Sequence, residues 1–139
     1  MITSLPHSLA FEGVGHVYGR HVVLADFDLS VMAGEVVCLL GPSGCGKSTV
    51  LRLAAGLEAL RHGRIAIDGR IVAGPDVDVP PELRRTGMVF QDHALFPHLD
   101  LLANVAFGLD GADRRTRAQN WLERVGLGDR SATFPHQLS

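Results

Sequence analysis

The chain has 139 residues, of which 46% are apolar and 20% charged, which is ordinary for a globular domain with one core. Its net charge is -2 and its arginines are spread out apart from Arg84-Arg85 and Arg114-Arg115, so we expect solvated arginines and no nucleic-acid partner. No apolar run approaches the roughly 18 residues of a membrane span, and the N-terminus lacks the basic start of a secretory signal. We therefore expect the chain to stay in the cytosol.

The first half of the chain alternates β-like and helical patterns. Short β-like stretches run from Leu9 to Val31, and Val36 to Leu40 is apolar on both faces, as a central parallel strand must be when helices cover it. Residues Ser48 to Leu57 have helical spacing of apolar positions, with Gly56 near the end. The order is strand, glycine loop, helix.

After this helix the pattern changes again. Asp68-Gly69 separates alternating apolar positions and predicts a two-residue hairpin turn, residues 75–81 form a loop, and Gly87 to Phe90 resembles another buried strand. Beyond Pro97, Asp100 is expected to cap a helix that carries Leu101, Leu102, Val105 and Leu109. A second helix from about Asp113 is expected to bury Ala118, Trp121, Leu122 and Val125.

The only lysine of the chain, Lys47, lies in the stretch GPSGCGKST from Gly41 to Thr49. The spacing of Gly41, Gly46, Lys47 and Ser48 is the phosphate-binding loop pattern. Glycines let consecutive N–H groups turn toward phosphate oxygens, and the helix that follows adds the positive end of its dipole. Lys47 would place a cation on the β- and γ-phosphates, and the Ser48 hydroxyl would ligate Mg²⁺.

Alternatives to this interpretation follow from the residues themselves. A glycine-rich turn could meet the pattern by chance, and the loop alone does not choose among kinases, GTPases and transport ATPases. Cys45 is most simply a small residue tolerated in the loop, and Cys38 and Cys45 are expected to be reduced thiols rather than a disulfide.

Three stretches together resemble the ATP-binding subunits of ABC transporters: GPSGCGKST, GMVFQDHALFPHL and NVAFGL. Within this family, the sequence is most similar to importer ATPases of the ferric iron, polyamine, sulfate and sugar groups. The stretch VPPELRR favours the ferric iron group. The resemblance runs from about Tyr18 to Ser139. It implies an α/β fold with a P-loop NTPase core and an N-terminal antiparallel β part over residues 1–91, followed by a helical subdomain over residues 92–139 that is incomplete at the C-terminus.

The resemblance also implies roles for particular residues. Tyr18 occupies the place of the aromatic residue that stacks on adenine, although a strand-end core tyrosine is the alternative. Gln91 matches the family's Q-loop glutamine, which reaches Mg²⁺ and the attacking water, so the metal ligands are Ser48 and Gln91. The implied ligand is Mg-ATP, and the remaining contacts come from the loop: Gly41, Pro42, Ser43, Gly44, Cys45, Gly46, Lys47, Ser48 and Thr49.

Partners follow from the same resemblance. The segment from Asp92 to Leu99 resembles the surface that receives a coupling helix from a transmembrane permease, with burial against the helical part as the alternative. A second ATP-binding subunit would complete the site in the full-length form. The assembled protein would be cytoplasmic and peripheral to the inner face of the membrane.

In the family, Leu138-Ser139 begins the LSGGQ signature, and the Walker B strand, catalytic glutamate and switch histidine come later. We therefore expect an N-terminal portion of an importer ATPase that does not hydrolyse ATP efficiently by itself. A self-sufficient nucleotide-binding module without turnover and a truncated product without function are the alternatives. A small-molecule kinase is disfavoured, because the Gln91 segment stands where acceptor and lid residues would be expected.

Overall fold

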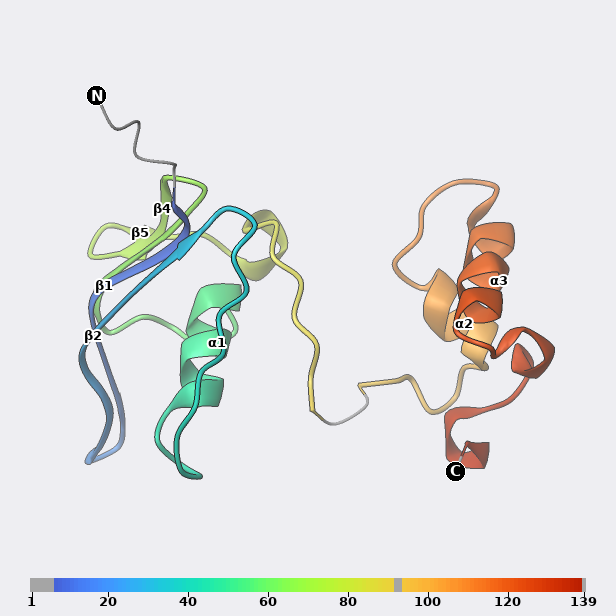
Figure 1. The fold of residues 1–139 in the computed structure, drawn as a ribbon, viewed down its shortest axis with the longest axis horizontal. Helices are drawn as coiled ribbons and strands as arrows, with labels where there is room; N and C mark the ends of the chain where they lie inside the picture. The colour runs from blue at the N-terminus through green and yellow to red at the C-terminus, as the bar shows by residue number, and fades with distance from the viewer. Residues whose placement is uncertain (1–6, 92–93, 139) are drawn as a thin grey trace. The chain divides into compact units, whose positions relative to one another are not determined.

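The computed structural model describes residues 7–91 and 94–138, and the chain divides into two compact units at Met88 and Val89. The first unit contains a five-stranded antiparallel sheet with the order β2-β1-β3-β4-β5 and one α-helix (Figure 1). The strands are β1 (His7–Tyr18), β2 (His21–Met32), β3 (His62–Ile67), β4 (Arg70–Gly74) and β5 (Val77–Asp78). The helix is α1 (Lys47–Ala55), and a short 3-10 helix, η1, covers Pro81–Leu83.

The core of this unit lies between α1 and the sheet. Val50 and Leu53 of α1 pack with Phe11, Val14 and Ile65 of the strands, and each of these five side chains is at most 4% exposed. Burial of large apolar side chains is the main stabilising contribution in a domain of this size. The position of α1 is therefore determined by its packing on the sheet.

The predicted β3–β4 hairpin turn is confirmed. Asp68 and Gly69 both have positive φ, 48° and 74°, as a type I′ turn requires, and Ile67 pairs with Arg70 across it. The loop predicted at residues 75–81 is only partly correct, because β5 occupies Val77–Asp78 and η1 begins at Pro81.

The two parallel strands predicted at residues 36–40 and 87–90 are not formed. Both segments are irregular, and Val36, Leu40 and Val89 are 90%, 91% and 96% exposed. A strand exists only where a neighbour accepts and donates its backbone hydrogen bonds. Within residues 7–91 and 94–138, neither segment pairs with a strand. Their apolar pattern is that of interior strands, but the described residues contain no neighbour that pairs with them.

The second unit is helical. Its helices are α2 (Leu101–Ala106) and α3 (Arg114–Arg124), which pack together, and the 3-10 helices η2 (Gly128–Arg130) and η3 (Pro135–Gln137) follow. Asp100 caps α2 as predicted, because its side chain accepts a hydrogen bond from the Ala103 N–H at 2.7 Å. None of the helices in the described part of the chain is long and apolar enough to cross a membrane.

The prediction for α3 is wrong at two positions. Ala118 and Leu122 are buried, but Trp121 and Val125 are 51% and 65% exposed. Residues four apart lie on one face of a helix, and Ala118 and Leu122 form the buried face of α3. Trp121 lies outside this face, and Val125 follows the last helical residue. The Arg124 guanidinium lies 4.3 Å from the centre of the Trp121 ring, a cation–π contact on the surface.

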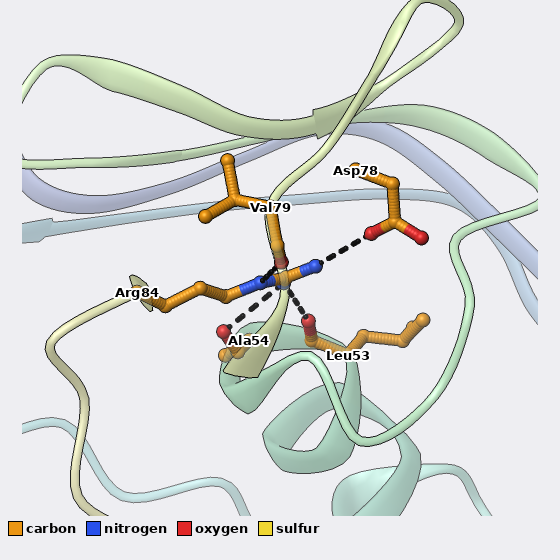
Figure 2. A network of polar contacts seen from close by, with 5 residues as sticks. All are labelled: Leu53, Ala54, Asp78, Val79 and Arg84. Atoms are coloured by element: carbon orange, nitrogen blue, oxygen red, sulfur yellow. Dashed lines mark hydrogen bonds and ion pairs between the residues drawn. The ribbon is translucent and has the colours of Figure 1, made fainter. Parts of the chain in front are cut away.

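Arg84 was expected in solvent and is instead 3% exposed. Its guanidinium lies between the end of α1 and the segment that follows β4 (Figure 2). It donates to the carbonyl oxygens of Val79 at 2.6 Å, Leu53 at 2.7 Å and Ala54 at 3.3 Å, and it pairs with Asp78 at 2.9 Å. Burial lowers the pKa of Arg84, and the Asp78 carboxylate acts in the opposite direction.

Arg84→Met should therefore destabilise the chain by about 3 kcal/mol, because three backbone carbonyls would lose a charged hydrogen-bond donor that water cannot easily replace. Arg85→Met is the matched control, since Arg85 is exposed and its change should stay within about 0.5 kcal/mol. Urea unfolding followed by circular dichroism measures both. Equal effects for the two substitutions would contradict the anchoring role of Arg84.

Candidate functional site

The candidate site is the loop of residues 41–46 with the first turn of α1. The helix begins at Lys47 after Gly46, whose φ of 97° is left-handed. No side chain caps this end, and its first turn contains no acidic residue. The first N–H groups and the positive end of the dipole are therefore not neutralised by a carboxylate of the helix itself, which favours an anion there.

Lys47 holds the loop together. Its Nζ atom donates to the carbonyl oxygens of Gly41 at 2.9 Å and Pro42 at 2.8 Å, and it lies 3.6 Å from the Cys45 Sγ atom. No carboxylate forms an ion pair with Lys47 within the part of the chain that the structure describes. The ammonium therefore organises the loop and keeps a positive charge that the neutral carbonyls do not cancel.

Two glycines of the loop have a steric reason to be glycine. A β-carbon at Gly46 would lie 3.0 Å from the side chains of Val23 and Leu24 of β2, so the loop approaches the sheet closely here. A β-carbon at Gly41 would meet the Cys45 Sγ atom at 2.7 Å. Gly44 also has positive φ, 84°, but a β-carbon there would touch none of the described residues within 4 Å. The space beside Gly44 is thus open.

The remaining loop residues differ in exposure. Pro42, Ser43, Cys45 and Ser48 are exposed, whereas Thr49 is only 6% exposed. The Ser48 hydroxyl is therefore accessible to a ligand of the loop, while Thr49 belongs to the packed side of the first turn.

Tyr18 lies at the end of β1 and is 42% exposed, so the alternative of a buried core tyrosine does not hold. Its hydroxyl donates to Glu58 Oε2 at 3.1 Å, and its ring meets the ring of His16 edge-on with centres 4.7 Å apart. Sequence analysis gave neither His16 nor Glu58 a role. Local patterns carried no signal for them, because Glu58 is 40 residues from Tyr18 along the chain.

Gln91 is exposed and belongs to the second unit, whereas the loop belongs to the first, so its place in the site stays a prediction. The predicted permease-facing segment is described from Ala94 onward, and Asp92 and His93 lie outside the described residues. Within it Leu95 and Phe96 are 41% and 38% exposed, so both side chains are partly covered and partly accessible, and the permease-facing role stays a prediction.

Asn104 organises this exposed segment. Its Oδ1 accepts from the Phe96 N–H at 2.8 Å, and its Nδ2 donates to the carbonyls of Phe96, Leu99 and Asp100 at 3.0 to 3.1 Å. The ring of Phe96 also packs against that of Phe107, with centres 4.4 Å apart. Asn104 is part of the NVAFGL stretch, but its clamping role requires the fold of the segment and was not predicted.

A glycine loop that joins a lysine-led helix to a sheet defines the class of phosphate-binding P-loop proteins. The family model described as ABC transporter matches residues 24–139, and the chain belongs to this family of ATP-binding proteins. The family predicted from the sequence is therefore confirmed.

Several named proteins are similar to this chain over nearly its whole length. A spermidine/putrescine import ATP-binding protein, PotA, of Methylococcus capsulatus is 49% identical over 94% of this chain and 34% of its own length. An Fe(3+) ions import ATP-binding protein, FbpC, of Agrobacterium fabrum is 43% identical over 100% of this chain and 40% of its own. The chain thus spans 34% to 40% of the length of these relatives.

A solved structure supports the fold. The ATP-binding cassette MJ0796, a dimeric post-hydrolysis state bound to ADP and phosphate, matches with a TM-score of 0.78 and 31% identity. The match covers 94% of this chain and 63% of that one. The predicted fold class, an α/β P-loop core with an antiparallel β part and the start of a helical part, is confirmed by this likeness.

The two positive-φ glycines allow a matched test of the loop. Gly44→Ala should cost about 1 kcal/mol of unfolding free energy from backbone strain alone. Gly46→Ala should cost roughly 3 kcal/mol, because the new methyl group also meets β2. Urea unfolding of the two variants measures the difference, and equal costs would contradict the close approach of Gly46 to the sheet.

Proposed function

We propose that this chain binds Mg-ATP through the loop of residues 41–49, as the nucleotide-binding part of an ABC importer subunit. The observation that carries the proposal is the Lys47 ammonium, held by two loop carbonyls at the uncapped start of α1 without a carboxylate partner in the described residues. Such a site suits a polyanion, because a cation, a helix dipole and exposed loop N–H groups act together.

Each proposed contact has a physical role. Lys47 and the loop from Gly41 to Gly46 would hold the phosphates, and the exposed Ser48 hydroxyl would ligate Mg²⁺. Tyr18 would stack on the adenine. Gln91 would be the second Mg²⁺ ligand and the residue that orients water, a role carried over from the resemblance alone. The open space beside Gly44 is compatible with phosphate oxygens, which a side chain there would crowd.

In the full-length protein, we propose that hydrolysis of ATP drives import of a small solute. The FbpC relatives are named for Fe(3+) ions and the PotA relative for spermidine and putrescine. The VPPELRR sequence favours ferric iron as the solute. The segment from Asp92 to Leu99, with Leu95 and Phe96 exposed, would contact a transmembrane permease on the cytoplasmic face. A second ATP-binding subunit would complete the site, as the dimeric cassette suggests.

The second candidate is nucleotide binding without turnover by the 139-residue chain. It is favoured by the composition of the loop itself, because residues 41–49 contain no carboxylate or imidazole and activation of water needs a positioned base. The two candidates share the binding step and differ in the release of phosphate.

Lys47→Ala should weaken Mg-ATP binding by at least about tenfold, because a charge-assisted contact to phosphate is lost. Calorimetric titration measures the affinity, and circular dichroism on the same sample verifies that the variant is folded. Arg52→Ala is the control, because Arg52 is an exposed cation in the last turn of the same helix and should leave affinity unchanged. Unchanged affinity in folded Lys47→Ala protein would refute the phosphate role of Lys47.

A further inference from the structure

His16 in β1 is a buried histidine without a hydrogen bond. Its side chain is 2% exposed, and neither Nδ1 nor Nε2 has a hydrogen-bond partner among the described residues. Buried polar atoms nearly always have a hydrogen-bond partner. The His16 imidazole instead has a polar neighbour just beyond hydrogen-bond distance. That neighbour is Glu58, whose Oε1 lies 3.6 Å from Nε2.

Glu58 connects His16 to Tyr18. While Oε1 faces the imidazole, Oε2 accepts the hydrogen bond from the Tyr18 hydroxyl at 3.1 Å. The Tyr18 and His16 rings also meet edge-on, with 74° between their planes. Tyr18 is therefore held twice, at its hydroxyl by Glu58 and at its ring by His16, although it remains 42% exposed.

The path of the chain brings Glu58 to this place. Gly56 ends α1 in a left-handed conformation, with its N–H donating to Leu53, and the Leu57 N–H donates to Arg52 at 2.9 Å. This cap reverses the chain and directs Glu58 toward the end of β1. The three side chains therefore come from β1 and from the turn after α1, both in the first unit.

We propose that Glu58, supported by His16, is a positioning residue that fixes the Tyr18 ring for stacking on the base of a nucleoside triphosphate. The inference rests on the proposed ATP site and explains how the chain would gain affinity for the adenine base. An exposed tyrosine loses rotamer freedom when it stacks on a base, and this loss weakens binding. A ring that Glu58 and His16 already hold in place loses less rotamer freedom, so binding is stronger. The effect should be confined to the base, since no hydrogen bond or ion pair joins Glu58 or His16 to the phosphate loop among the described residues.

The experiment compares ATP with inorganic tripolyphosphate, which offers the phosphates without the base. Glu58→Leu should weaken Mg-ATP binding about fivefold and leave Mg-tripolyphosphate binding unchanged. Glu58→Gln, whose amide oxygen still accepts from the hydroxyl, should stay within about twofold of the unmodified chain for both ligands. Calorimetric titration of the 139-residue chain measures all affinities.

Tyr18→Phe completes a double-mutant cycle. It removes the hydroxyl and keeps the ring, so it should weaken ATP by about the same factor as Glu58→Leu, and the double variant should be no weaker than either single one. Tyr18 is the only tyrosine of the chain, so incorporation of 3-fluorotyrosine gives a single fluorine resonance. That resonance should shift on adding ATP, remain in place with tripolyphosphate, and move in ligand-free Glu58→Leu protein.

The outcomes separate this inference from the proposed function. If the unmodified chain does not bind Mg-ATP, both are rejected. If it binds ATP and Glu58→Leu binds equally well, only the positioning role is rejected. Equal weakening of ATP and tripolyphosphate binding in Glu58→Leu protein would also overturn the positioning role, because a contact that only stabilises the first unit would affect both ligands. The positioning role would also be rejected if the losses of ATP affinity caused by Glu58→Leu and Tyr18→Phe multiplied in the double variant.

Discussion

The C-terminal end of α1 is the constraint on which the nucleotide site depends. The last carbonyls of a helix have no partner within it, and here the carbonyls of Leu53 and Ala54 lie under the sheet, where water is scarce. The Arg84 guanidinium donates to both carbonyls, of which that of Leu53 also accepts from the Gly56 N–H, and it reaches the Val79 carbonyl as well. A helix that packs on the sheet by Val50 and Leu53 and is bonded at its end has little freedom to shift. Its first turn, which carries Lys47, is fixed in consequence.

Much of the site could be predicted because its cause is local. The loop pattern predicts the geometry of the loop, because glycine is favoured where φ is positive and where the chain touches β2, and Lys47 follows Gly46 directly. The turn at Asp68-Gly69 and the Asp100 cap are equally local, because a few adjacent residues decide each. Family, fold class and phosphate loop were all accessible from such stretches.

What could not be predicted depends on residues distant in sequence. Arg84 resembles any surface arginine until η1 brings it to the end of α1, 31 residues earlier in the chain. The relation of Glu58 to Tyr18 likewise needs the cap at Gly56 and the end of β1 to be placed first. The segments at residues 36–40 and 87–90 show the opposite case: their apolar pattern is that of interior strands, but strand formation needs a neighbour that the described residues do not provide.

The helix α1 also connects the two parts of the proposed nucleotide site, the phosphate loop and the tyrosine proposed to stack on the base. Its first turn follows the phosphate loop, and the turn after its last residue carries Glu58, which holds Tyr18. Nine helical residues at about 1.5 Å each form a short rigid rod between these points. A change that tilts the rod, such as loss of the Arg84 contacts, would displace Lys47 and Glu58 together. Base and phosphate affinity should then fall together, whereas the proposed positioning role predicts that changes at Glu58 itself affect the base alone. A joint loss of base and phosphate affinity thus indicates a displaced helix, and a loss of base affinity alone indicates a tyrosine that is no longer held.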